Sequence, residues 1–208
     1  MNTNIRINLQ ARLSGNGKVT VVLGAGKKAY PGSITIDKLD LPNIDIVADL
    51  ESGLSFLPDS SVDEIQSTSF FEHITNFNQL MIDIYRVLKP NGIINLFVPH
   101  FSNPYFYSDP THVRHFGYYT FYYYSKRQEK LFRRVPTFYN SCDFKITSTK
   151  FIFISIYPII SLLKRIFGAI CNSSVRLQEF YEGHLTNICW CYGIEVKMEA
   201  TKGPTSET

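Results

Sequence analysis

Val19–Asp49 constrains the fold more strongly than any other stretch of the sequence. Its first part, Val19–Leu23, is apolar and mostly β-branched, as expected of a central parallel strand that is buried on both faces. The glycine turn Gly24–Gly26 follows, and two further expected strands end at Asp37 and Asp49. In open α/β sheets, ligands bind at the carboxyl edge of the strands. The stretch therefore predicts a binding edge that carries a glycine turn and two carboxylates.

The remaining patterns predict further strands and one amphipathic helix. Apolar residues recur at i, i+3, i+4 and i+7 from Phe77 to Leu88, and Thr75 or Asn76 is placed to cap the start of this helix. Breaker residues at 89–92 end it. The expected strands are 33–36, 44–48, 62–67 and 93–98, followed by two late strands, 144–147 and 194–199, that can pair as a hairpin. This order favours an α/β protein with a mostly parallel sheet.

Length and composition indicate one globular domain. The 208 residues can bury an ample core, and 44% hydrophobic with 19% charged residues is an ordinary globular balance. We expect one domain over 1–200, with its core in 19–147 and 191–200 and an aromatic, apolar insertion at about 148–190. The polar residues 201–208 are expected to form a disordered tail.

Charge, cysteines and the N-terminal sequence bear on partners and location. The net charge is +3 and the basic residues are scattered, so nucleic-acid binding is not indicated. The four cysteines form no CxxC pair, which favours buried thiols over a metal site, and no metal is expected. The N-terminal residues lack the apolar core of a signal peptide, which makes a cytoplasmic protein the simplest interpretation.

One apolar stretch, Phe151–Cys171, leaves two interpretations open. Its uncharged run ends at Leu163, short of the roughly 20 residues that a membrane span needs, and Pro158 interrupts it. A buried strand followed by a core or lid helix is the first interpretation. The second is a peripheral membrane contact through Ile159–Ile170.

The spacing after the glycine turn indicates the kind of ligand. A dinucleotide site uses GxGxxG, with the pyrophosphate at the N-terminus of the next helix, but the third glycine is absent here. Only Lys27–Gly32 separates Gly26 from the next strand, which leaves no room for a regular helix. A ligand without phosphates does not need that helix, and S-adenosylmethionine is such a ligand.

Two acids fit an adenosine ligand. Asp37 follows the second strand, where a carboxylate can accept both ribose hydroxyls; a turn-capping acid is the alternative. Asp49 follows the third strand and can accept from the adenine amino group, with Leu50 packing on the ring. The sequence therefore favours an adenosine that carries no phosphates.

Several motifs together resemble the class I S-adenosylmethionine-dependent methyltransferases of the broad type 11 group. They are LGAGKKAYPGSITID, DIVADLESGLSFLPDSSVDEI, STSFFEHI, the helix end YRVLKPNG and IINLFVPH, within Val19–Phe116. A DPTH segment after the fifth strand looks like that of methyltransferases associated with polysaccharide biosynthesis. The resemblance implies a three-layer Rossmann-like methyltransferase fold, whose mostly parallel seven-stranded sheet has an antiparallel C-terminal hairpin strand. It also implies transfer of a methyl group from S-adenosyl-L-methionine to an oxygen or nitrogen of a small-molecule or glycan-type acceptor.

The resemblance also assigns residues to the cofactor. The glycine turn matches the contact with the methionine moiety, and the S-x-x-E-H stretch at 69–73 matches a segment beside the cofactor. Lys27 departs from the pattern, because many members have a small residue there. The residues matched to the cofactor are Gly24, Ala25, Gly26, Asp37, Asp49, Leu50, Ser69, Phe70, Glu72 and His73.

The segment after the fifth strand holds the candidate chemistry. Seven of the thirteen tyrosines lie in Phe101–Tyr124, and they are expected to form pocket wall and core. Methyl transfer from a sulfonium is an in-line displacement that depends on alignment, and a hydroxyl or amine acceptor can also need a base. His112 and His115 are the candidate bases because histidine titrates near neutral pH. Asp109 can orient one of them or bind the acceptor.

Two other functions remain open. A nicotinamide-dependent oxidoreductase can use a similar sheet, but the short Lys27–Gly32 link and the missing third glycine argue against it. A non-catalytic protein of the same fold, acting as a partner or scaffold, is the other alternative. The glycines, the acids and the DPTH segment weigh against it.

Overall fold

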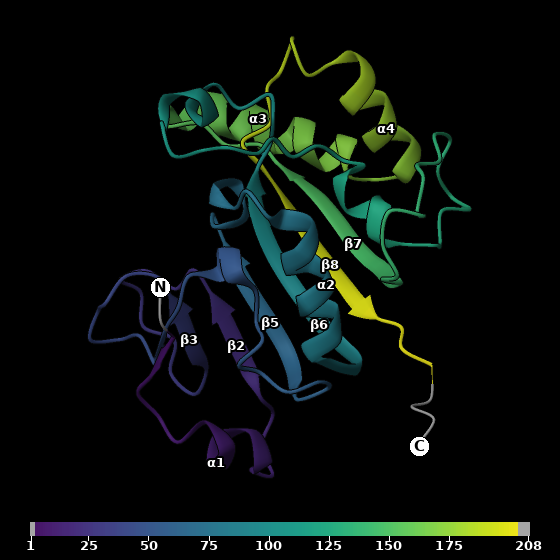
Figure 1. Cartoon of the computed structure of the whole chain (residues 1–208). Helices are drawn as coiled ribbons and strands as arrows, with labels where there is room; N and C mark the ends of the chain where they lie inside the picture. Colours follow the sequence, from purple (N-terminus) through teal and green to yellow (C-terminus); the bar gives the residue numbers. More distant parts are fainter. Residues whose placement is uncertain (1–2, 204–208) are drawn as a thin grey trace.

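The computed structural model describes residues 3–203, and an eight-stranded sheet runs through the described part of the chain (Figure 1). The strands are β1 (Asn4–Ile5), β2 (Thr20–Leu23), β3 (Ile34–Asp37), β4 (Ile46–Val47), β5 (Val62–Thr68), β6 (Leu88–Pro99), β7 (Phe144–Ile152) and β8 (Gly193–Ala200). Their order in the sheet is β1-β4-β3-β2-β5-β6-β8-β7. The predicted tail at 201–208 lies mostly outside the described residues.

The pairing of the strands confirms a mostly parallel sheet. Strands β2 to β6 pair in parallel, while β8 runs antiparallel to both β6 and β7. The hairpin predicted from the two late strands is therefore confirmed. The strand beyond the seven expected is β1, which pairs antiparallel with β4 and is too short to give a periodic signal. The strand order reverses at β2, which lies between β3 and β5, and this switch point is where such sheets bind ligands.

The connection from β2 to β3 contains no helix. Residues 24–33, all within the described part of the chain, form turns and bends. The expectation from the short spacing is therefore confirmed. The carboxyl ends of β2 and β3 lie side by side, with Leu23 paired to Ile36.

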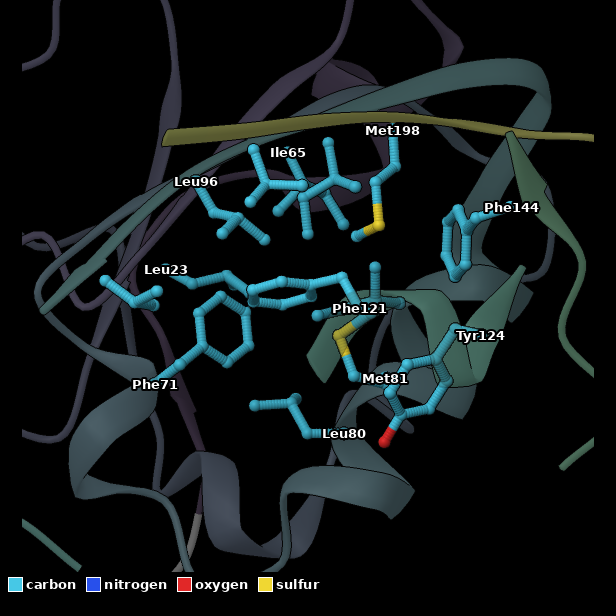
Figure 2. Close-up of a cluster of buried hydrophobic side chains, with 14 of the residues drawn as sticks. Leu23, Ile65, Phe71, Leu80, Met81, Leu96, Phe121, Tyr124, Phe144 and Met198 are labelled. Atoms are coloured by element: carbon cyan, nitrogen blue, oxygen red, sulfur yellow. The ribbon is translucent and has the colours of Figure 1, made fainter. Parts of the chain in front are cut away.

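The helix α2 (Phe77–Val87) buries its apolar stripe against the sheet, and Figure 2 shows this core. Leu80 and Met81 of α2 pack beside side chains from β2, β5, β6 and β8 in that view. The predicted side-chain cap at Thr75 or Asn76 is absent. Instead, the backbone N–H groups of Thr75 and Asn76 donate to the Glu51 carboxylate at 2.6 and 2.8 Å.

Short helical segments follow several strands. They are α1 (Leu9–Ser14) and the 3-10 helices η1 (Leu50–Ser52), η2 (Phe71–His73), η3 (Pro104–Ser108) and η4 (Thr120–Tyr124). The tyrosines of η4 enter the core, where Tyr122 and Tyr124 are buried. Tyr105 and Tyr107 of η3 remain exposed. The tyrosine-rich segment therefore divides between core and surface.

The region between β7 and β8 folds as two helices, α3 (Pro158–Cys171) and α4 (Val175–His184). The sheet continues to Ile152 at the end of β7, beyond the expected start of the insertion at about 148. None of the described helices is both long enough and apolar enough to span a membrane.

Candidate functional site

Backbone geometry fixes the glycine turn after β2. Gly24 and Gly26 have φ values of 66° and 56°, in the left-handed region that glycine adopts at little cost. A Cβ at Gly24 would lie 2.5 Å from Cδ2 of Phe70. Ala25 is buried in a small apolar cluster with Val22 and lies outside the pocket lining. The turn therefore requires glycine at position 24 for both its conformation and its close approach to Phe70.

Asp37, the last residue of β3, braces this turn. The Gly26 N–H donates to Asp37 Oδ2 at 2.8 Å, and the Leu39 N–H donates to Oδ1 at 2.9 Å. The turn-bracing role considered as an alternative is therefore present. A carboxylate has about four acceptor positions, so two remain for a ligand.

The residues after β4 form the next wall of the site. Asp49 caps η1, because the Glu51 N–H donates to Asp49 Oδ1 at 3.1 Å. Leu50 is buried and lines the same pocket as Asp49. An apolar side chain thus lies next to a carboxylate, the combination expected beside an adenine.

These walls enclose a pocket of about 500 Å³ at the carboxyl ends of β2 to β5. Ligand pockets typically span about 300–1,000 Å³. Of the ten residues predicted to contact a cofactor, the structure brings eight to this pocket; Ala25 and Glu72 do not line it. The lining residues are Gly24, Gly26, Asp37, Lys38, Leu39, Ala48, Asp49, Leu50, Glu51, Ser69, Phe70, His73, Ile74 and Thr111.

Glu72 is buried just behind the pocket wall. It is 1% exposed, and its Oε2 has no hydrogen-bond partner among the described residues. Burial, reinforced by the nearby charge of Asp109, raises the pKa of the Glu72 carboxyl to about 7. Its backbone oxygen accepts hydrogen bonds from the N–H groups of Val113 and Arg114. Glu72 therefore carries a carboxyl that exchanges its proton near neutral pH and also anchors the DPTH segment.

A hydrogen-bonded chain orients His73, which lines the pocket. Thr111 Oγ1 donates to Asp109 Oδ1 at 2.6 Å, so the same hydroxyl accepts from His73 Nδ1 at 2.9 Å. The hydrogen bonds from Thr111 lower the pKa of the Asp109 carboxyl. In neutral His73, this arrangement places the proton on Nδ1 and leaves Nε2 with a lone pair. Thr111 lies in the DPTH segment, but sequence reasoning did not assign it a role.

His112 packs against the ring of His73 and is not among the residues that line the pocket. Their ring centroids are 4.8 Å apart. His112 Nδ1 is 2.9 Å from the Phe106 carbonyl oxygen, which can only accept, so Nδ1 carries the proton. Nε2 faces two carboxyl groups, 3.6 Å from Asp109 Oδ2 and 4.0 Å from Glu72 Oε1. The structure therefore brings the predicted residues His112 and Asp109 together with Glu72.

The other two histidines that follow the fifth expected strand, His115 and His100, lie in different surroundings. His115 is exposed and packs on Phe106, with ring centroids 4.6 Å apart. His100, at the end of β6, is fully buried, and its Nε2 is 2.8 Å from Glu182 Oε2. The Tyr118 N–H also donates to Glu182, so this cluster fixes the loop after β6. The sequence alone did not point to Glu182, which is 82 residues away from His100.

One group among the described residues has the geometry to hold a metal ion. Ligand atoms of Glu72, His73 and His112 all lie within 4.8 Å of one another. Both histidine Nδ1 atoms already have hydrogen-bond partners, so only Nε2 of each ring is available. Within the described part of the chain the cysteines are free thiols, and they form no such group.

The strand order defines the fold. The reversal at β2 and the antiparallel β8 give the sheet the Rossmann-like methyltransferase fold, and the pocket lies at the glycine turn of that sheet. A family model described as a methyltransferase domain matches residues 15–96, which is less than half of the chain. No curated protein matches the sequence.

Several solved structures share this fold at low sequence identity. One is an S-adenosylmethionine-dependent methyltransferase from Archaeoglobus fulgidus, with 16% identity, a TM-score of 0.54, and coverage of 93% of this chain and 91% of that one. The YcgJ protein from Bacillus subtilis has 14% identity, a TM-score of 0.51, and coverage of 94% and 97%. Phosphoethanolamine N-methyltransferase 2 from Haemonchus contortus, solved with S-adenosyl-L-methionine, has 12% identity, a TM-score of 0.50, and coverage of 93% and 51%.

Proposed function

We propose that the protein is an S-adenosyl-L-methionine-dependent methyltransferase acting on an oxygen or nitrogen of a small-molecule or glycan-type acceptor. One observation carries the proposal: a glycine turn, Asp37 and the pair Asp49–Leu50 line one pocket at the switch point of the sheet. S-adenosylmethionine supplies a methyl group on a positively charged sulfur. The proposed class of acceptor rests on the resemblance noted above and on the partly exposed, aromatic segment after β6.

The pocket lining suits the parts of this cofactor. Asp37 keeps lone pairs for the ribose hydroxyls, since its two backbone donors use only part of its capacity. Leu50 offers an apolar surface for the adenine, and Asp49 an acceptor for its amino group. The remaining wall, Ser69–Phe70 and His73, would then lie beside the methionine portion.

The groups around the DPTH segment are the candidates for taking up the proton of the acceptor. An acceptor hydroxyl must lose its proton as it attacks the methyl group, and a positioned base contributes about 10²–10⁴-fold in rate. His112 is the proposed base, with Nε2 as the accepting atom, although its side chain is not among those that line the pocket. Asp109 and Glu72, 3.6 and 4.0 Å from Nε2, would stabilise the resulting imidazolium. Asp109 also orients His73 through Thr111. His115, which packs on Phe106, is the weaker candidate.

The alternatives fit the geometry less well. A dinucleotide would need phosphate-binding backbone donors at a helix N-terminus, and residues 24–33 contain no helix. A non-catalytic role does not account for a buried carboxyl with a pKa near 7 and two histidines close to the pocket.

Calorimetric titration with S-adenosylmethionine, its demethylated product and NAD tests the proposal. We expect saturable binding of the first two and none of NAD. Incubation with cofactor labelled in the methyl group, across a panel of hydroxyl and amine acceptors including glycans, then identifies the acceptor class. Binding of NAD alone would overturn the proposal, and cofactor binding without transfer to any acceptor would favour the non-catalytic alternative.

A further inference from the structure

The helix α3 turns an apolar stripe towards solvent. Ile159, Leu163, Ile166 and Ile170 recur at spacings of four, three and four residues, so they share one side of the helix. Each is between 54% and 77% exposed, as is the neighbouring Leu162. We call these five residues the apolar face of α3. In most surface helices such a stripe is buried in the core.

The opposite side of α3 is the one that packs on the protein. Gly168 and Cys171 are buried there, and a Cβ at Gly168 would lie 2.7 Å from Phe153. The helix is therefore held by these small residues and by Phe167, whose ring packs on Phe153 with centroids 5.2 Å apart, and its exposed large apolar residues face outward. The exposed Ile156 and Tyr157, just before the helix, extend the same apolar surface along the chain.

The charges within α3 have one sign. Residues 151–175 contain no Asp or Glu, and their two basic residues are Lys164 and Arg165. Arg165 lies exposed within α3, and Lys164 is placed over the ring of Trp190, 3.1 Å from its centroid. Apolar side chains bordered by Lys, Arg, Tyr and Trp are the composition of helices that lie in a membrane interface.

The topology places α3 at the same edge of the sheet as the pocket (Figure 1). Ile152, the last residue of β7, pairs with Gly193, and Gly193 pairs with Pro99 at the carboxyl end of β6. The ring of Trp190, which lies under Lys164 of α3, packs on Tyr105 of η3 with ring centroids 5.7 Å apart. The helix α3 is thus linked through Lys164 and Trp190 to the segment that precedes Asp109.

We propose that the apolar face of α3 docks on the surface of an anionic lipid bilayer, with the helix lying in the plane of the interface. The helix has 14 residues and is too short to cross the hydrocarbon layer. Insertion of its large side chains buries them, while the basic residues meet the anionic headgroups. Docking brings the carboxyl edge of the sheet, with its pocket, close to the membrane. The docking itself does not depend on the proposed function.

Charge distinguishes a lipid surface from a second copy of the chain. In a twofold dimer through the apolar face of α3, two acid-free basic segments would face each other. Like charges across an interface oppose association. An anionic bilayer complements both the apolar and the basic side chains.

Flotation of the full chain with vesicles tests the proposal. Vesicles of equal parts phosphatidylglycerol and phosphatidylcholine should carry the protein, and vesicles of phosphatidylcholine alone should carry less. Leu163→Glu and Ile166→Glu should each lower partitioning by about tenfold or more, since each replaces an inserted apolar group with a charge. Phe138→Glu is the matched control: Phe138 is 78% exposed on a different part of the chain, and partitioning should not change.

Three outcomes would overturn the proposal. They are wild-type protein that does not float with anionic vesicles, glutamate variants that float like wild type, and a lipid-free dimer in sedimentation that Leu163→Glu converts to monomer. Unfolding midpoints of the variants check that they remain folded. Titration of the same samples with S-adenosylmethionine separates the two claims, because cofactor binding can fail while vesicle binding persists.

Discussion

Two carboxyl groups at the carboxyl edge of the sheet contrast in their surroundings. Asp37, on the proposed cofactor side, accepts hydrogen bonds from two backbone N–H groups and lines the pocket. Glu72, behind the proposed acceptor side, is almost fully buried and its Oε2 has no partner among the described residues. The first is held ready to accept hydrogen bonds from a ligand. The second is held where its proton is exchangeable near neutral pH.

This difference separates two functions in the proposed methyltransferase: binding of the cofactor and transfer of a proton. Binding a neutral ribose needs fixed acceptors, which short backbone turns supply at little entropic cost. Moving a proton needs groups whose pKa lies near the working pH, and burial provides this.

The largest effect is expected on the acceptor side, from His112→Ala. Loss of the base should lower kcat by about 10²–10⁴-fold at neutral pH with an acceptor hydroxyl. His115→Ala should cost less than about tenfold, because His115 packs on Phe106 and faces no carboxyl group in the described structure. Steady-state rates with the identified acceptor measure both. Equal losses in the two variants would remove the distinction between the histidines.

Glu72→Gln should change how stability depends on pH. The pKa of Glu72 is raised from its ordinary value of 4.5 to about 7, so the folded protein binds an extra proton between these values. Wild-type stability contributed by this group is therefore full below pH 4.5 and is lost as pH rises to 7. The variant does not titrate and should gain about 3 kcal/mol relative to wild type across this window.

Urea unfolding of both proteins at several pH values measures this relative gain. Any pH-independent difference in the free energy of unfolding between Glu and Gln cancels when the difference between the two proteins is compared across pH values. Parallel curves for the two proteins would show that burial does not raise the pKa of Glu72.

On the cofactor side, Asp37→Ala should weaken S-adenosylmethionine binding by about 100-fold, since hydrogen bonds to a charged group contribute roughly 1.5–3 kcal/mol each. Asp37→Asn keeps one acceptor oxygen and should retain part of the affinity. Calorimetry on the two variants provides the comparison. Unchanged affinity in Asp37→Ala would place the ribose elsewhere.

The smallest effect is expected for Gly24→Ala. The new Cβ meets Phe70 at 2.5 Å, and φ is 66°, so folding should lose about 1–2 kcal/mol. Gly17→Ala is the control, because a Cβ there has no neighbour within 4 Å and φ is not positive. Thermal unfolding of both variants measures the difference.

The residues of the proposed cofactor side were largely predictable from sequence. Each of them directly follows, or ends, the strand that positions it. The glycine turn, Asp37 and Asp49 each follow a β-branched run, and parallel strands bring their ends to one edge. The short link at 27–32 excluded a helix by length alone. These features depend on local pattern and on strand order.

Features that depend on long-range contacts were less predictable from sequence. The partners of His73 and His100 lie 38 and 82 residues away, and no periodicity reports them. Glu51, which caps α2, contacts a residue 24 positions later. The stripe of α3 was visible in sequence, but the same spacing serves a buried or an exposed face. The packing of Gly168 and Phe167 against Phe153 turns this stripe towards solvent.

The most direct test of the proposed cofactor site is a crystal structure with the demethylated product of S-adenosylmethionine bound. We predict that its ribose hydroxyls lie within hydrogen-bond distance of the Asp37 carboxylate and that its adenine packs against Leu50. Its sulfur should lie on the side of the pocket formed by Phe70 and His73. Density at another cavity, or an adenosine that leaves Asp37 without a ligand contact, would contradict it.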